Sequence, residues 1–218
     1  VTDVGIATLG MLAESALLQT VHLTLPSAHN HTWGVPFLAE ALRTAPSMTS
    51  LSLAFCNHTP SKSLPEALSA IHTAPALTSF NLCLNYSEVG DRGAQMLAAF
   101  RAAPVLKSLT LRLKHNNIGS QGAQALASLK TAPHLTSLTV DLDGNHLQDA
   151  GAHALAGLRH STSLTELSLN FEQNGVGPSG LRAIALLLDV PALRAPSLTP
   201  RPRRRGKSRV DAAKDLLN

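Results

Sequence analysis

Two carboxylates at alternate positions, Asp141 and Asp143, have the spacing of a pair that could carry acid–base chemistry. In such a pair one carboxyl donates a proton while the other accepts one, provided that their surroundings separate their pKa values. Alternate residues of a strand project to one face, so both side chains are expected on the same surface. The sequence offers no nucleophile or base to work with them. We therefore predict that the chain is not an enzyme and has no catalytic residues.

Histidines and glycines are the other residues that could indicate metal or cofactor chemistry. The chain has 10 histidines, and the tightest cluster is His29-Asn30-His31. Alternate residues of a loop can chelate, but no Cys, Asp or Glu lies near them in the sequence to complete a ligand set. We expect an exposed polar loop there and no metal site. No glycine-rich phosphate loop or Gly-x-Ser-x-Gly elbow is present, because the glycines recur at a regular spacing, and no cofactor is predicted.

That regular spacing runs through the whole chain. A leucine or methionine recurs every 29 residues, at Met48, Leu77, Leu106, Leu135, Leu164 and Leu193. Leu18 stands 30 residues before Met48, so the first unit carries one extra residue. Self-similarity at such a period is the signature of a stacked solenoid, in which each unit buries its apolar face against its neighbours.

The unit from Leu106 to His134 shows what each repeat should form. From Leu109, three leucines alternate with polar residues, which is the period of a half-buried strand. Further on, Leu126 and Leu129 have the spacing of one face of a helix. Pro133 ends that helix, because the residue before a proline avoids helical angles. Each unit is therefore a strand followed by a helix.

This pattern resembles the ribonuclease-inhibitor-like class of leucine-rich repeats, as found in NOD-like receptor arrays. The matching residues are the Leu-x-x-Leu-x-Leu strand, the turn from Asn116 to Gly119 and the helix start from Gly122 to Ala127. The resemblance implies an α/β leucine-rich-repeat solenoid, a horseshoe arc with a parallel β-sheet on the concave face and α-helices on the convex face. We expect six parallel strands and seven helices, counting one near residues 4–17.

An asparagine recurs at the same position of three consecutive units: Asn116, Asn145 and Asn174. A buried amide at such a position can bond the turning backbone, whose polar groups otherwise lack partners. A ligand site is the alternative interpretation. We favour the first, in which the column is a ladder that specifies the fold.

The repeats define one elongated domain over residues 1–193 and a separate tail over 194–218. The repeats start at residues 18, 48, 77, 106, 135 and 164, and residues 1–17 form a partial N-terminal repeat. Because that partial repeat lacks its strand, we expect a fragment of a longer array. Beyond Leu193 the rhythm fails, since Pro196 and Pro200 occupy apolar strand positions that a central parallel strand does not accept.

The tail carries the positive charge of the chain. It holds eight Lys or Arg against two Asp, although the whole chain has a formal net charge of +4. Charge and proline prevent a packed core, so the tail is predicted to be disordered. One alternative is association with nucleic acid or the nucleus through Arg203, Arg204, Arg205 and Lys207. Another is that the true seventh repeat has been replaced.

Two further features bear on location. No apolar run reaches the roughly 18 residues of a membrane span. Cys56 and Cys83 lie on adjacent strands but two residues out of register, about 8 Å apart at Cα, which is beyond disulfide reach. Unpaired thiols suit a reducing compartment. We predict a cytoplasmic protein, with a nuclear location as the alternative, and no membrane association.

The predicted concave face is where we expect binding, because solenoids present that surface to their partners. Its charged positions begin at the fourth repeat. They are Arg112, Lys114, Asp141, Asp143, Asn170 and Glu172. Stacking in register should pair Arg112 and Lys114 with Asp141 and Asp143, since neighbouring strands lie about 4.8 Å apart.

The leading hypothesis is a non-enzymatic scaffold that binds a protein partner of unknown identity on this face. The acidic stretch should attract basic groups, with an association rate that falls as salt rises. Solubility alone could also explain the charges. The second functional alternative is a GTPase activator of the Ran type, because those proteins resemble this repeat class. They usually carry an acidic segment after the repeats, whereas this tail is basic, which counts against it.

Overall fold

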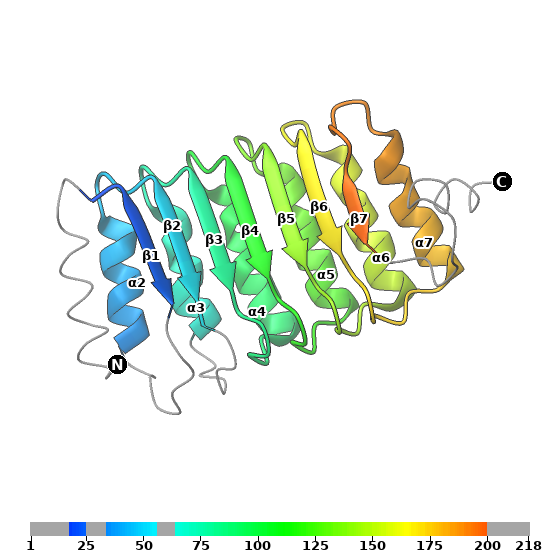
Figure 1. Cartoon of the computed structure of the whole chain (residues 1–218), viewed down its shortest axis with the longest axis horizontal. Coiled ribbons are helices and arrows are strands. Elements are labelled where there is room, and N and C mark those ends of the chain that lie inside the picture. Colours follow the sequence, from blue (N-terminus) through cyan, green and yellow to red (C-terminus); the bar gives the residue numbers. More distant parts are fainter. Residues whose placement is uncertain (1–17, 25–33, 56–63, 200–218) are drawn as a thin grey trace.

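The computed structural model describes residues 18–24, 34–55 and 64–199 of the chain. They form two layers, with the strands on one side and the helices behind them (Figure 1). The strands are β1 (Thr20–Thr24), β2 (Ser50–Ala54), β3 (Ser79–Cys83), β4 (Ser108–Arg112), β5 (Ser137–Asp141), β6 (Glu166–Asn170) and β7 (Ser197–Thr199). The α-helices are α2 (Gly34–Thr44), α3 (Leu64–Ser69), α4 (Gly90–Leu97), α5 (Ser120–Ala127), α6 (Gln148–Ala156) and α7 (Pro178–Ala185).

The sheet is parallel and follows the chain from β1 to β7 without a crossover. Its register is the repeat of the sequence: Leu109 lies opposite Leu138, and Leu111 lies opposite Val140. The prediction of parallel pairing between these strands is therefore confirmed. Each strand follows the same path one repeat later, so residues at equal repeat positions stand side by side across the sheet.

The apolar residues that alternate along the strands and those on one face of the helices pack into one continuous, mainly aliphatic core. Leu109 and Leu111 of β4 are 1% and 0% exposed, and Leu126 of α5 is 1% exposed. A short 3-10 helix follows most of the α-helices, for example Ser128–Thr131 after α5, and buries Leu129. Gly122 is needed where α5 passes its neighbours, because a Cβ there would lie 2.6 Å from the Ile118 side chain.

The sheet has one strand more than the sequence predicted. In β7, Leu198 lies opposite Leu169 of β6, at the position where a next repeat would place a leucine. The prediction of six strands was wrong because it treated the prolines as incompatible with a central strand. Among the described residues β7 is the last strand, and an edge strand tolerates Pro196 beside it. The repeat geometry thus extends to Thr199, past the boundary expected at residue 193.

Several expectations fall on parts of the chain that the structure does not describe. They are the helix near residues 4–17, the cluster His29-Asn30-His31, Cys56, and the basic residues Arg203, Arg204, Arg205 and Lys207. The lack of a disulfide at Cys83 and the disorder of the tail therefore stay predictions.

The asparagine column is a ladder inside the turns, as predicted. The Asn145 Oδ1 accepts the backbone N–H groups of Asn116 and Ile118, each at 3.0 Å. Its Nδ2 donates to the carbonyl oxygens of Leu113 at 2.9 Å and Leu142 at 2.8 Å. Asn145 is 2% exposed, so each of these groups would otherwise be buried without a partner. Asn116 and Asn174 bond the turns next to them in the same way.

A second link between repeats was not predicted. The Asp91 Oδ1, at the start of α4, accepts the N–H groups of Gly119 at 2.7 Å and Gly122 at 2.8 Å. These groups open α5, so the carboxylate of one repeat caps the helix of the next. Asp149 of α6 does the same for α7, through Gly177 at 2.6 Å and Gly180 at 3.0 Å.

Candidate functional site

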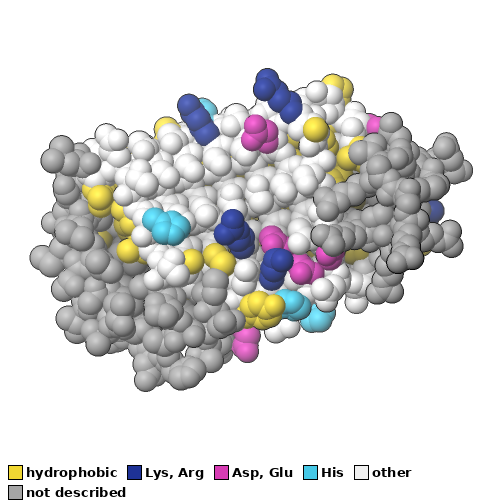
Figure 2. Space-filling model, in the orientation of Figure 1, with side chains coloured by type: hydrophobic (Ala, Val, Ile, Leu, Met, Phe, Trp, Pro, Cys, Tyr) yellow, Lys and Arg dark blue, Asp and Glu magenta, His cyan; other side chains and the backbone are white. Residues whose placement is uncertain are grey.

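The candidate site lies on the sheet face, the side of the sheet away from the helices. Figure 2 shows Lys or Arg side chains next to Asp or Glu side chains near the middle of this face. We call the predicted residues there the charged cluster: Arg112, Lys114, Asp141, Asp143, Asn170 and Glu172. Arg112, Asp141 and Asn170 end their strands and stand side by side in the register. The other three follow two residues later in each repeat.

Lys114 lies between the two carboxylates. Its Nζ is 3.4 Å from Asp141 Oδ2 and 3.7 Å from Asp143 Oδ2. The side chains of Lys114, Asp141 and Asp143 are 34%, 19% and 14% exposed, so the acids are more enclosed than the base. The predicted ion pairing is confirmed for Lys114, which serves both aspartates.

The predicted pairing was wrong for Arg112. Within the described residues Arg112 makes no ion pair, although it stands directly opposite Asp141 in the register. The oxygens of Asp141 are already engaged, one by Lys114 and the other by the Asn170 Nδ2, which donates at 2.8 Å. An exposed arginine would also lose side-chain entropy if it were held there. Arg112 therefore remains an exposed positive charge beside the pair.

Asn170 connects the acids to the sixth repeat. Besides donating to Asp141, it accepts the backbone N–H of Glu172 through its Oδ1 at 3.2 Å. The structure thus brings five of the six predicted residues into one chain of contacts, from Lys114 to Glu172.

Asp143 is the least satisfied member of the cluster. Its Oδ2 faces Lys114, whereas its Oδ1 is buried and has no hydrogen-bond partner in the described part of the chain. A buried acceptor without a donor costs on the order of 1–3 kcal/mol, and more when it is charged. This unsatisfied oxygen adds to the excess of negative charge in the cluster.

The cluster also sets the ionisation of its lysine. Burial alone would lower the pKa of Lys114, but the charges of Asp141 and Asp143 and their hydrogen bonds outweigh it and raise that pKa above its ordinary value. Lys114 is therefore a cation throughout the physiological range. One ammonium faces two carboxylates, so the three groups together carry a negative charge.

Next to the cluster lies an aromatic pair that the sequence analysis did not single out. The rings of Tyr86 and His115 stack with centroids 4.7 Å apart and planes 16° from parallel, and Tyr86 is 54% exposed. Backbone bonds tie the pair to the cluster, because Tyr86 N–H donates to Lys114 and His115 N–H donates to Asp143. A Cβ on Gly144 would clash with the His115 ring, so glycine leaves room for the stack. The available signal was the spacing of Tyr86, His115 and Gly144 by the repeat period.

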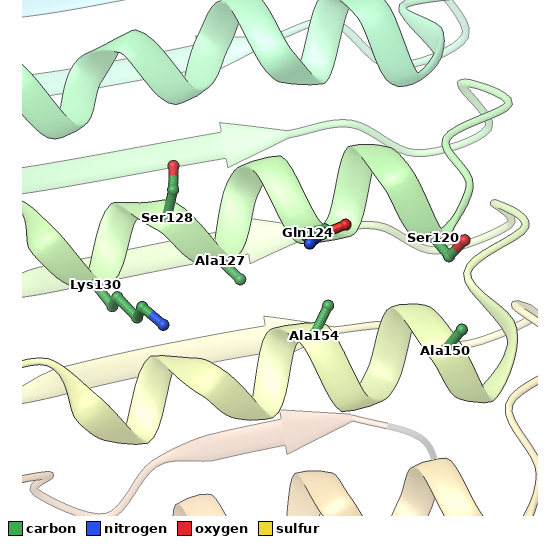
Figure 3. Close-up of a pocket in the computed structure, with 7 residues that line it drawn as sticks. All are labelled: Ser120, Gln124, Ala127, Ser128, Lys130, Ala150 and Ala154. Carbon is green, nitrogen blue, oxygen red and sulfur yellow. The ribbon is translucent and has the colours of Figure 1, made fainter.

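The helix side offers a different surface. A shallow hollow of about 550 Å³ lies between α5 and α6, lined mainly by small side chains (Figure 3). Lys130 is the one charged residue among those that line it. The hollow therefore lacks the paired titratable groups that acid–base chemistry needs.

Metal binding and membrane insertion are two further functions on which the described residues bear. Within them, no group of three or more His, Cys, Asp or Glu side chains could hold a metal ion. None of the described helices has the length and apolar character to cross a membrane.

Comparison with known proteins places the repeats in a family. A leucine-rich-repeat family model matches residues 105–127, 133–156 and 160–185, which cover β4 to α7. No curated protein matches the sequence.

Two solved structures match this chain at low identity. A structure of the leiomodin-1 actin-binding site 2 is 20% identical, with a TM-score of 0.49 over 73% of this chain and 87% of that chain. Internalin C2 of Listeria monocytogenes strain 4b F2365 is 16% identical, with a TM-score of 0.37 over 91% and 84%.

The family match falls on strands that share one register with the strands before and after them. The seven-stranded parallel sheet with helices on one side is the arrangement expected of such repeats. The matched units of this chain are leucine-rich repeats, and the described residues together form an open α/β solenoid.

Proposed function

We propose that this protein is a non-enzymatic interaction module that binds a protein partner through the charged cluster on its sheet face. The observation that carries the proposal is an excess of negative charge, because Asp141 and Asp143 are both partly exposed and share a single cation, Lys114. The partner is expected to present basic groups to Asp141, Asp143 and Glu172.

The electrostatics of the cluster support this choice. Lys114 supplies one positive charge to two carboxylates and contacts one oxygen of each. The remaining negative charge faces outward from a rigid sheet, whose backbone bonds hold the side chains in place. A basic partner would be steered to the acids in solution, and the rate of association should fall as salt rises.

Charge reversal tests the proposal. The double variant Asp141→Lys, Asp143→Lys should lose capture of the partner from lysate, while the wild type retains it. The isosteric variant Asp141→Asn, Asp143→Asn should show a smaller loss in the same direction, and circular dichroism should confirm that it is folded.

The matched control is Glu166→Lys with Asp189→Lys. These exposed residues lie away from the cluster, and their reversal changes the net charge by the same amount. Capture should persist in this control. If the cluster variants capture the same proteins as the wild type, the charges serve only solubility and the proposal fails.

The other predictions are less favoured by the described residues. The GTPase-activator alternative has no specific feature there in its support, and the nucleic-acid alternative depends on the tail, outside the described residues. The cytoplasmic or nuclear location stays a prediction.

A further inference from the structure

We infer that the partner segment presents arginine, and that the exposed Tyr86–His115 stack is the second half of its docking surface. This inference rests on the proposed function and adds the side-chain chemistry that the surface selects. It combines two independent observations, the excess negative charge of the partly exposed Asp141 and Asp143 carboxylates and the exposed aromatic stack beside them.

The two carboxylates favour a donor with several N–H groups. Lys114 supplies a single ammonium to Asp141 and Asp143, so these partly exposed acids can still accept directed hydrogen bonds from a partner. A guanidinium carries five N–H donors in a planar fork and is more weakly hydrated than an ammonium. It can therefore satisfy an enclosed carboxylate oxygen at a smaller desolvation cost than lysine.

The aromatic stack favours the same group. The Tyr86 ring is held by its stacking on His115, so less side-chain freedom remains to be lost on binding. With more than half of its surface exposed, its ring offers a face on which a guanidinium can lie flat. Arginine pairs with aromatic faces in this way more often than lysine does.

The spacing of the two features fits one extended segment. Tyr86 and Asp143 belong to repeats two strands apart, which is about 10 Å across the sheet. Three residues of extended chain span about the same length. A segment with two glycines between two arginines has this length, and the backbone freedom of glycine lets both arginine side chains turn to the same side, one on Tyr86 and the other at Asp143.

Short peptides test this directly. The probe is a capped peptide with two arginines separated by two glycines, compared with the lysine analogue and with a glutamate analogue as the negative control. Affinities are measured by fluorescence anisotropy on the whole chain. The arginine peptide should bind about 2–5-fold more tightly than the lysine peptide, the ratio expected of an exposed cation–π contact.

Variants separate the two halves of the surface. Tyr86→Leu keeps an apolar side chain but removes the aromatic face, and it should reduce the preference for arginine to the part that the carboxylates contribute. Tyr86→Phe should retain that preference. Asp143→Asn should weaken the binding of both basic peptides and make that binding less dependent on salt. The substitution removes the charge but keeps the shape of the side chain.

The outcomes distinguish the inference from the proposed function. If both basic peptides bind equally and Asp143→Asn weakens both, the cluster binds cations but the role of the aromatic stack is wrong. An arginine preference as large in Tyr86→Leu as in the wild type would likewise show that the role of the aromatic stack is wrong. If neither basic peptide binds, or binding ignores Asp143→Asn, both the inference and the proposed function are overturned.

Discussion

Two polar columns run along the same turns of this solenoid, two residues apart in each repeat. The inner column consists of Asn116, Asn145 and Asn174, and the outer column consists of Lys114, Asp143 and Glu172. In the inner column the Asn145 amide uses its donors and its acceptor for hydrogen bonds to the backbone of its own turn and of the neighbouring turn. In the outer column Asp143 leaves one oxygen without a partner.

The difference shows how burial separates structural from binding groups. A fully buried amide must find its partners within the chain, because an unpaired one costs stability in every molecule. A carboxylate at the rim of the sheet can keep an oxygen unpaired, since Lys114 offsets its charge, and part of its side chain remains exposed to a partner. The inner column should therefore determine stability, and the outer column should determine recognition.

The largest effect is expected from the inner column. Asn145→Ala would leave the N–H groups of Asn116 and Ile118 buried without an acceptor. At about 1–3 kcal/mol for each, the free energy of unfolding should fall by roughly 2–6 kcal/mol. Urea denaturation measures the loss. A loss below about 1 kcal/mol, small for even one such orphaned group, would show that water enters the turn and that the two columns do not differ in kind.

A substitution in the core provides a reference for the loss of stability expected of Asn145→Ala. Leu126→Ala removes a fully buried side chain on the helix face of the fourth repeat. The expected loss is about 2–5 kcal/mol, from lost burial and the cavity left behind. If urea denaturation places Asn145→Ala in the same range, the inner polar column stabilises the fold as strongly as the leucines do. An unchanged midpoint for Leu126→Ala would mean that the assigned register is wrong.

A smaller effect is expected for the carboxylates that cap helices. Asp149→Ala removes the acceptor for the Gly177 and Gly180 N–H groups, and should cost about 0.5–2 kcal/mol. Ser120, the residue at the equivalent repeat position, is the control: Ser120→Ala should change stability by less than about 0.5 kcal/mol. Equal losses in thermal unfolding of the two variants would contradict the capping role.

The smallest effect on stability is expected in the outer column, together with a gain in binding. Lys114→Met should change the free energy of unfolding by about 0–1 kcal/mol, as for other partly exposed pairs. Removing its charge should strengthen binding of a basic peptide, because the two aspartates then lack their internal cation. Weaker binding would show that Lys114 itself contacts the partner.

The same lysine gives a pH dependence with a definite sign. Its pKa is raised in the folded protein, so the stability that it contributes is present below the ordinary lysine value of about 10.4. That stability is lost as the pH rises through the raised value. Between neutral pH and pH 9, roughly, unfolding of the wild type and of Lys114→Met should therefore differ by a constant amount.

The sequence predicted the parts of the fold that are marked by residues recurring at the repeat period. It failed where the structure depends on individual residues. Recurrence of Leu109, Leu126 and Asn145 at one period fixed the strands, the helix face and the ladder, because stacked units place equal positions side by side. The seventh strand was missed because prolines were judged for a central strand, whereas β7 lies at the edge of the described sheet.

The candidate site was predictable only in outline. The rows of charge gave the position of Lys114 and Asp143, since strand register follows the repeat. Which base pairs with which acid depends on rotamers and competing donors, and there Arg112 differed from expectation. The Tyr86–His115 stack requires left-handed backbone at both residues, at φ 57° and 51°, which the spacing alone does not reveal.

The carboxylate caps have a consequence for how the array opens. Helices of eight residues, such as α4, α5 and α7, are too short to persist alone, so each depends on its neighbours. Asp91 couples α4 to α5 and Asp149 couples α6 to α7, whereas no carboxylate caps α6 from α5 in the described structure. In a one-dimensional chain of coupled units, the α5–α6 interface then lacks one link that the α4–α5 and α6–α7 interfaces have. Local opening of the solenoid should therefore be most frequent between α5 and α6, where faster amide hydrogen exchange would reveal it.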